Sequence, residues 1–481
     1  MKFIARMAGP VAAVLIALLV DIPDHPHAPA MLGVATWMAI WWISECVPIA
    51  FTALIPLIAF PLAGITTGKD IAPRYVNSII FLFIGGFLIA QALERTGLHK
   101  RLALTLLSRF HASPLQLAAG FSIATAFLSM WISNTATTML MVTIAMPLLT
   151  RLGEDHGKEA IAPMATAFLL VIAYSANIGG MGTPVGTAPN LVFLQTVRAH
   201  APELTPSFLQ WMTVGIPMVI AGLAVLFLVL GPQLAKLPWK SSDADSLHAE
   251  RAALGPMQLG EKIVAWVLSL TAMAWMSRKG IHADSLTIPG WASLLPYKGV
   301  DDGTVAMFGA AWLFLLRGNN GKPVLNGEAF LKLPWDIVLL LGGGFALAYG
   351  MLHAGASAWL GTQLEFLANL PVPLMMLGIA LVMTFLTEIT SNTAITQVML
   401  PILAAAAIGN HMDLLLVLLP ATLSASCAFM LPVATPPNAI VFGTHQVPMR
   451  AMSRTGIRLN LIMTVIVTGI VLLFRPLLSG G

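Results

Sequence analysis

Long apolar stretches alternate along this chain with short polar segments that are rich in Pro, Gly and charged residues. A helix crosses the hydrocarbon core of a bilayer in roughly 20 residues, so apolar stretches of about that length predict membrane spans. Eleven spans are predicted, near residues 8–20, 30–44, 47–65, 77–97, 163–194, 206–231, 261–278, 303–317, 336–354, 413–443 and 457–475. The pattern therefore predicts an all-α polytopic membrane protein with about 11 transmembrane helices.

Two more apolar segments, near residues 113–151 and 371–408, are interrupted at their centres by one tetrapeptide, Ser-Asn-Thr-Ala. It occurs at Ser133–Ala136 and again at Ser391–Ala394. Each segment is long enough to enter the membrane and return, and polar side chains are costly in hydrocarbon unless they are paired or line a cavity. We therefore predict two re-entrant helical hairpins, each with a polar tip.

The order of motifs is the same in the two halves of the chain. Phe87 follows a Gly-Gly pair as Phe345 does, and the segment that ends at Asn190 resembles the one that ends at Asn438. Counting spans, the halves cross the membrane in opposite directions, which predicts inverted repeats with the binding site at their interface. The predicted organisation is an N-terminal span and loop (1–30), a first repeat (31–231), a cytoplasmic linker (232–262) and a second repeat (263–481).

Composition and charge agree with a membrane protein. The chain is 57% hydrophobic and 10% charged, whereas soluble domains carry about 25% charged residues. If the N-terminus is cytoplasmic, 18 of the 25 Lys and Arg residues lie on the cytoplasmic side, so the positive-inside rule predicts this orientation and an external C-terminus. We predict a multi-pass protein of a bacterial-type inner membrane, with its first apolar run retained as a span rather than cleaved as a signal peptide.

Several function classes are excluded by what the sequence contains. The net charge of +4 is modest and is explained by charges at the membrane surfaces, so no nucleic-acid partner is expected. Two cysteines cannot form a disulfide framework or a four-ligand zinc site. The sequence has no P-loop, dinucleotide fingerprint or metal-ligand spacing, so no organic cofactor is expected.

The Ser-Asn-Thr tips have groups for ions of both signs. Helix N-termini and the donors of Asn and Thr suit a carboxylate, whereas freed carbonyls and side-chain oxygens suit a hard cation such as sodium. The alternative is that Ser and Thr only hydrogen-bond to helix carbonyls. No Lys, Arg or His lies in either tip. A dianion held there needs mobile cations, which points to coupled sodium.

Gly179–Asn190 and Leu431–Asn438 form a second repeated pair of segments, rich in Gly and Pro. Because these residues disfavour helix, both segments predict unwound backbone, which the membrane tolerates where the backbone lines a cavity. An ordinary proline kink is the alternative. Neither segment contains Lys, Arg or His.

Glu45 and Glu388 are the carboxylates that stand out within apolar sequence. Such a residue is either a proton or cation relay or a brace hydrogen-bonded to nearby backbone. Since the first hairpin has Met130 where the second has Glu388, bracing is the favoured interpretation of Glu388. Ser133 and Ser391 have no nearby His or Lys, so an enzyme is not predicted.

With these motifs the sequence resembles the divalent anion:sodium symporter family over nearly its whole length. The most specific parts of the resemblance are the two Ser-Asn-Thr motifs and the segments Gly-Thr-Ala-Pro-Asn and Ala-Thr-Pro-Pro-Asn. The resemblance implies a homodimer with a scaffold domain at the dimer contact. It also implies an elevator-type transport domain that carries both hairpins.

The resemblance further implies two sodium sites and one substrate site. The first sodium site would consist of Ser129, Ser133, Asn134 and Gly186, and the second of Thr387, Ser391, Asn392 and Ala434. The substrate carboxylates would meet Asn134, Thr135, Thr187, Asn392, Thr393 and Pro436.

The expected function is symport of sodium with a C4-dicarboxylate such as succinate, malate or fumarate, with sodium binding first. Some relatives are sodium-independent exchangers with basic side chains where sodium would sit, and no such side chain occurs at the tips of this chain. The alternatives are a sodium-independent dicarboxylate exchanger, a symporter for another divalent anion such as citrate or sulfate, and a channel. The expected partners are sodium, the dicarboxylate, the lipid bilayer and a second copy of the chain.

Overall fold

A computed structural model describes residues 2–110, 113–235, 245–283, 286–297 and 299–475, and the structural statements below concern these residues. Part of the predicted linker (236–244), Lys298 and the last six residues of the predicted external C-terminus lie outside the described residues.

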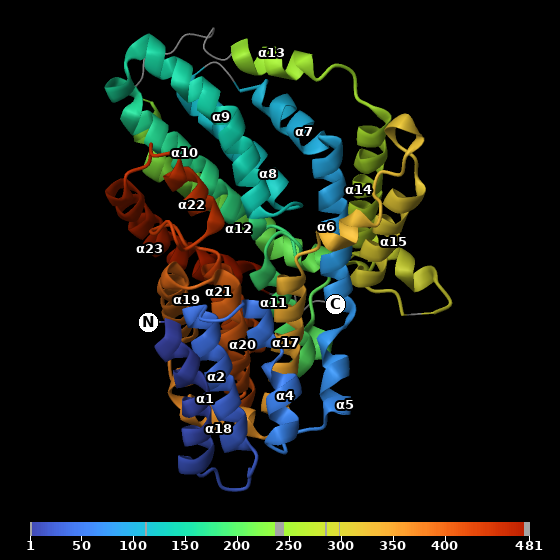
Figure 1. The fold of residues 1–481 in the computed structure, drawn as a ribbon, viewed down its shortest axis with the longest axis vertical. Helices are drawn as coiled ribbons and strands as arrows, with labels where there is room; N and C mark the ends of the chain where they lie inside the picture. Colours follow the sequence, from blue (N-terminus) through green and yellow to red (C-terminus); the bar gives the residue numbers. More distant parts are fainter. Residues whose placement is uncertain (1, 111–112, 236–244, 284–285, 298, 476–481) are drawn as a thin grey trace.

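The first half of the chain is helical throughout, with two short 3-10 turns (Figure 1). Its elements are α1 (Lys2–Leu19), α2 (Ala28–Ser44), α3 (Ile49–Ala53), α4 (Ile55–Leu62), α5 (Gly68–Ile71), η1 (Ala72–Tyr75), α6 (Ser78–Thr96), α7 (Leu98–Leu107), α8 (Pro114–Ser129), α9 (Asn134–His156), α10 (Lys158–Gly180), α11 (Ala188–His200), η2 (Pro202–Leu204) and α12 (Phe208–Leu234).

The second half is also helical, apart from one small β-hairpin. Its elements are α13 (Asp245–Ala253), α14 (Leu259–Ser277), β1 (Gly280–Ala283), β2 (Leu286–Pro289), η4 (Trp291–Leu294), α15 (Asp302–Leu315), η5 (Asn319–Gly321), α16 (Glu328–Leu331), α17 (Trp335–His353), α18 (Ala356–Gln363), η6 (Glu365–Leu367), α19 (Val372–Ile389), α20 (Asn392–Gly409), α21 (Leu414–Ala425), α22 (Pro436–Gly443) and α23 (Met449–Phe474).

The predicted all-α membrane fold is confirmed. Among the described residues, ten helices are long and apolar enough to cross a membrane, and shorter apolar helices such as α2, α15 and α21 add to them. Strands β1 and β2 pair antiparallel, with Gly280 opposite Pro289, and lie outside the spans. The sequence pattern did not predict this hairpin, because four residues per strand are too few for a clear alternation.

The structure differs from four of the predicted spans. The span predicted at 47–65 is two helices that meet at Leu54, just before Pro56, which removes a backbone donor. The spans predicted at 163–194 and 413–443 are each broken, between α10 and α11 and between α21 and α22. The last span begins at Met449 rather than near 457, so three arginines belong to the helix itself.

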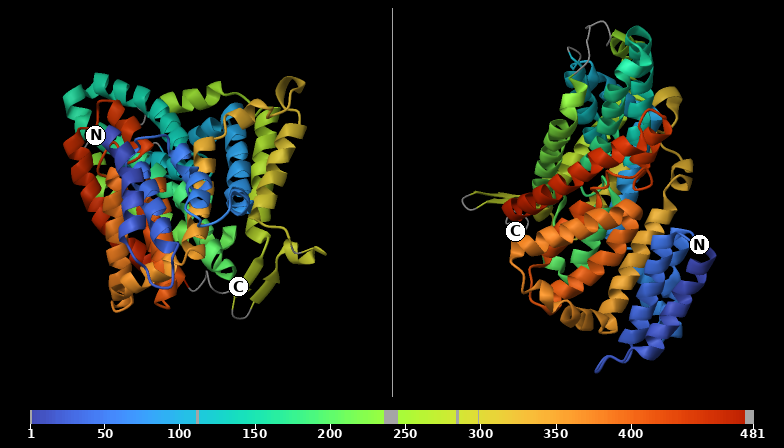
Figure 2. Two further views of the ribbon diagram at one scale, coloured as in Figure 1. Left: turned by 60° about the horizontal axis from the view of Figure 1, so that its bottom comes forward. Right: turned by 90° about the vertical axis from the view of Figure 1, so that its left-hand side faces the viewer.

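Close helix packing surrounds the centre of the molecule. Helices α6 and α15 approach so tightly that a Cβ on Gly85 would lie 2.6 Å from the backbone of Ala306, as small residues allow at helix contacts in membranes. Helix α10 is almost wholly buried between α8, α9, α12 and α22. In the left view of Figure 2, the N-terminus and α13 lie at one end of the molecule and the β-hairpin at the other.

Candidate functional site

Both Ser-Asn-Thr motifs lie where an apolar helix turns back on itself, as predicted for hairpin tips. In the first hairpin, α8 ends at Ser129 and α9 begins at Asn134, with the Ser133 hydroxyl accepting a hydrogen bond from the backbone N–H of Ala136. In the second, α19 ends at Ile389 and α20 begins at Asn392. Each tip therefore presents a helix N-terminus beside its Asn and Thr side chains.

The two tips share one pair of hydrogen bonds around the tip Asn. The Ser129 hydroxyl donates to Asn134 Oδ1 at 2.6 Å and to the Ala176 carbonyl at 2.8 Å. The Thr387 hydroxyl donates to Asn392 Oδ1 at 2.5 Å and to the Ala425 carbonyl at 2.9 Å. In each hairpin, a hydroxyl near the end of the first helix (α8 or α19) thus links the tip Asn to the broken helix beside it (α10 or α21).

Both Gly- and Pro-rich segments contain unwound backbone, although the breaks do not have the predicted bounds of 179–190 and 431–438. Backbone from Met181 to Thr187 separates α10 from α11, and backbone from Ser426 to Thr435 separates α21 from α22. The Asn190 carboxamide donates to the carbonyls of Gly180 (3.0 Å) and Thr183 (2.7 Å). These bonds satisfy carbonyls freed by the break, so Asn190 secures the loop.

Asn438 has the corresponding role in the second half. Its carboxamide donates to the carbonyls of Ala428 and Leu431, both at 3.0 Å. The two loops are therefore closed by the same chemistry, which the shared Pro-Asn ending of the two segments reflects.

Glu388 makes hydrogen bonds that the first half does not have. Its carboxylate accepts from the backbone N–H groups of Phe429 (2.7 Å), Met430 (2.9 Å) and Leu431 (3.1 Å), and from the Asn460 carboxamide (2.7 Å). These contacts agree with the bracing interpretation, because the carboxylate accepts hydrogen bonds from three backbone N–H groups that the helix break leaves without helical partners. At the equivalent place in the first half, the Thr183 hydroxyl donates to the backbone carbonyl of Met130.

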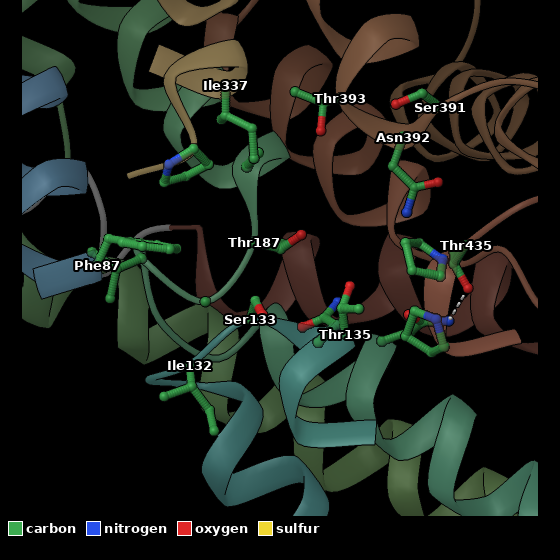
Figure 3. A pocket seen from close by; sticks show the side chains of 18 of the residues that line it. Phe87, Ile132, Ser133, Thr135, Thr187, Ile337, Ser391, Asn392, Thr393 and Thr435 are labelled. Atoms are coloured by element: carbon green, nitrogen blue, oxygen red, sulfur yellow. Dashed lines mark hydrogen bonds between the residues drawn. The ribbon is translucent and has the colours of Figure 1, made fainter. Parts of the chain in front are cut away.

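A cavity of about 780 Å³ lies between the tips and the two unwound segments (Figure 3). Figure 3 shows Ser133 and Thr135 on one side, Asn392 and Thr393 on the other, and Thr187 between them. The predicted site residues that line it are Ser133, Asn134, Thr135, Gly186, Thr187, Ser391, Asn392, Thr393, Ala434 and Pro436. The structure thus brings together every predicted substrate residue.

Ser129 and Thr387 lie behind the cavity wall. Both are completely buried and reach the cavity only through Asn134 and Asn392, the residues to which they donate. The oxygens around each tip belong to hydroxyls, carboxamides and backbone carbonyls, which are ligands that suit a hard monovalent cation. Among the described residues, no cluster of His, Cys, Asp and Glu could hold a metal ion.

The remaining wall of the cavity comes from helices outside the hairpins. Phe83 and Phe87 of α6 and Ile337 near the start of α17 are apolar, whereas Glu45 follows the last residue of α2. Glu45 is the one charged residue that lines the cavity in the part of the chain that the structure describes. A dianion in this cavity therefore has no fixed cation beside it.

Asn177 is a site residue that the sequence analysis missed. It is 2% exposed, lines the cavity, and donates through Nδ2 to Thr435 Oγ1 (3.1 Å) and Asn438 Oδ1 (3.4 Å). It therefore connects the two halves of the chain directly. The signal was present but weak: a carboxamide within the long apolar run of α10 needs a partner.

Gly180 packs directly against the first tip. A Cβ at this position would lie 2.7 Å from Asn134 Oδ1, so Gly180→Ala should displace the carboxamide. If Asn134 holds transported ions, losing one such contact lowers the transport rate roughly tenfold or more. Initial rates of sodium-driven anion uptake in proteoliposomes measure this effect.

The matched control is Gly378→Ala in α19, where a Cβ would meet nothing within 4 Å. This variant should transport at the wild-type rate. Wild-type transport by Gly180→Ala, with the protein incorporated equally, would contradict a role for the position of Asn134.

Two broken helices, two hairpin tips and one cavity between them are the arrangement of a secondary transporter. The chain belongs to the family described as the sodium:sulfate symporter transmembrane region, whose model matches residues 2–480. This confirms the family predicted from the motifs, and the protein is a transporter rather than an enzyme.

Similar proteins cover the whole chain. It is 36% identical over 491 residues to the sodium-dependent dicarboxylate transporter SdcS of Staphylococcus saprophyticus, with 100% of this chain and 92% of that protein covered. The SdcS of Staphylococcus aureus strain MRSA252 is 35% identical, with the same coverage. The crystal structure of the Alcanivorax borkumensis YdaH transporter is similar in fold, with a TM-score of 0.58 at 12% identity over 99% of this chain and 98% of that one.

Proposed function

We propose that this protein couples the inward movement of sodium to the uptake of a C4-dicarboxylate such as succinate, malate or fumarate. The observation that carries the proposal is the pair of Ser-Asn-Thr tips, which have matching hydrogen bonds and face one cavity. The described residues that line this cavity include no Lys, Arg or His. The similarity to proteins named sodium-dependent dicarboxylate transporters supports the same pair of substrates.

The first sodium ion would be held by Ser129, Ser133, Asn134 and Gly186, and the second by Thr387, Ser391, Asn392 and Ala434. In the structure, Asn134 Oδ1 accepts the Ser129 proton, and Asn392 Oδ1 accepts the Thr387 proton. A sodium ion would replace this proton as the partner of Oδ1, and the hydroxyl would turn a lone pair toward the ion. Both oxygens of each pair are then ligands without a change in the backbone.

The dicarboxylate would be bound by the donors of the same residues, Asn134, Thr135, Thr187, Asn392 and Thr393, and by contact with Pro436. A carboxamide has an acceptor on one atom and donors on the other. Sodium on Oδ1 therefore fixes the direction in which Nδ2 points, toward the cavity and a carboxylate. The N-termini of α9 and α20 add favourable partial charge. We infer from this that sodium binds first.

The two hairpins and the broken helices would move together as an elevator-type transport domain against a scaffold domain. The scaffold would include α6 and α17, whose side chains form the apolar wall of the cavity. We further propose a homodimer in a bacterial-type inner membrane, organised as two inverted repeats. The N-terminus and α13 would be cytoplasmic and the C-terminus external. In the left view of Figure 2, the N-terminus and α13 lie at the same end of the molecule.

Uptake by proteoliposomes that contain no dicarboxylate tests this function. An inward sodium gradient should drive succinate accumulation, and replacement of sodium with choline should abolish it. Uptake that is the same in choline would refute sodium coupling.

The same preparation separates the alternatives. Uptake that requires internal dicarboxylate would identify an exchanger, and transport without saturation or counterflow would identify a channel. A competition panel of succinate, citrate and sulfate then shows which divalent anion the cavity prefers.

A further inference from the structure

Helix α23 carries three arginines on one exposed face. Arg450, Arg454 and Arg458 are spaced four residues apart, and all three are exposed. Within the described ranges, none of them takes part in an ion pair or a hydrogen bond. Residues four apart lie on the same side of a helix, about 6 Å from one to the next. The arginines therefore form a ladder of three cations, each without a protein partner.

The same face of α23 becomes apolar beyond the ladder. Leu461, Val465 and Leu472 continue the spacing and are 48%, 61% and 39% exposed. One continuous stripe thus changes from cationic to apolar along the helix. This is the order of surfaces that a bilayer offers, from phosphate headgroups to hydrocarbon, and α23 lies at the edge of the molecule in Figure 1.

The opposite face of α23 fixes the direction in which the arginines point. Met452, Leu459 and Met463 are fully buried, and Gly456 lies so close to the unwound segment that a Cβ there would be 2.3 Å from the Phe429 carbonyl. The helix cannot rotate without losing this contact. The ladder is therefore held outward by the same segment that Glu388 braces.

A cavity of about 700 Å³ opens beside the first arginine. Pro448 and Ala451 form one side of it, and its other lining residues include Lys158 at the start of α10, Ile161 and His445. Lys158 also has no ion pair or hydrogen bond in the described part of the chain. The walls of the cavity combine apolar side chains such as Ile161 with polar ones such as Thr166 and Gln446, and a cation lies at its edge. Such a cavity suits a molecule with an apolar body and an anionic, hydrogen-bonding head.

We propose that the Arg450–Arg458 ladder and the adjoining cavity bind anionic phospholipids, with the lipid phosphates on the guanidinium groups. Arginine is suited to this role because its planar fork can donate two hydrogen bonds to one phosphate. A water-exposed face would not explain the apolar continuation of the stripe. The site is distinct from the transport cavity, so it does not depend on which anion is carried.

The test uses the full-length protein and phosphatidylglycerol as the probe. Native mass spectrometry of protein from mixed micelles gives the affinity for phosphatidylglycerol relative to phosphatidylcholine. Replacement of all three arginines (R450Q, R454Q and R458Q together) should reduce this preference at least about tenfold. The charge-preserving replacement of the three by Lys should keep most of it, which separates charge from misfolding.

The matched control removes three other exposed cations, with K262Q, R317Q and K322Q combined. It has the same net charge as the Gln triple and should keep the wild-type preference. Equal losses in both triples, or no loss in the arginine triple, would overturn the proposal. A change in oligomeric state of the arginine triple at unchanged lipid preference would also overturn it, since a second copy of the chain would then cover this face.

Discussion

Asn134→Ala and Asn392→Ala should each reduce sodium-driven dicarboxylate uptake by roughly hundredfold or more. Each substitution removes an oxygen proposed to bind sodium and a donor proposed to bind the anion, and hydrogen bonds to charged groups contribute about 1.5–3 kcal/mol apiece. Because every 1.4 kcal/mol is about tenfold, two lost contacts suffice for the predicted effect. Initial uptake rates, normalised to incorporated protein, are the measurement.

Asn410→Ala is the matched control, since Asn410 is also a partly buried Asn but bonds to the carbonyls of Gly361 and Ala406 away from the cavity. It should keep transport within a few-fold of wild type.

Asn134→Asp separates the two roles of the carboxamide, because it keeps the oxygen and loses the donor. Sodium should still bind to that variant, whereas the dianion should bind far more weakly. Normal uptake by Asn134→Ala or by Asn392→Ala would contradict the assignment of these residues to the transport site.

Glu388→Ala should give the largest loss of stability of any single substitution considered for this protein. The substitution leaves the backbone N–H groups of Phe429, Met430 and Leu431 without their acceptor, in a segment that cannot reform helix across its prolines. Breaking a buried charged network of this kind costs about 3–5 kcal/mol. Thermal unfolding in detergent should show a clearly lowered midpoint.

Glu388→Gln should lower the unfolding midpoint less than Glu388→Ala does. The amide oxygen of Gln can still accept hydrogen bonds from Phe429, Met430 and Asn460, which are the three partners of Oε1. Glu365→Ala, at an exposed carboxylate in η6, should leave the midpoint unchanged. If Glu388→Ala unfolds at the wild-type midpoint, the carboxylate does not brace the unwound segment, and a proton or cation relay becomes the favoured interpretation.

The sequence predicted those parts of the site where a short segment could not form an ordinary membrane span without a loss of free energy. Two Ser-Asn-Thr clusters in hydrocarbon and two runs of Gly and Pro cannot continue an ordinary span, so their positions alone predicted the tips and the helix breaks. The hydrogen-bonded state of Glu388 was predictable for the same reason, because a carboxylate three residues before a tip must find donors nearby.

The parts that sequence missed depend on distant contacts. Asn177 acquires its role only because α10 passes beside Thr435, a residue 258 positions away, which no local pattern contains. The start of α23 was placed too late because charged residues usually end a span, whereas here the arginines lie on the outer face of a helix that continues past them. The contribution of α6 and α17 to the cavity wall likewise follows from packing and not from any motif.

We propose that the two tips form one site at which sodium and a dicarboxylate bind together. Equilibrium binding of succinate to the purified protein, by calorimetry in sodium and in choline, tests it most directly. We expect sodium to lower the succinate Kd at least about tenfold in the wild type, and succinate to tighten sodium binding by the same factor. Neither effect should remain in Asn134→Ala or in Asn392→Ala. A succinate Kd that is equal in sodium and choline, or full coupling in either variant, would contradict it.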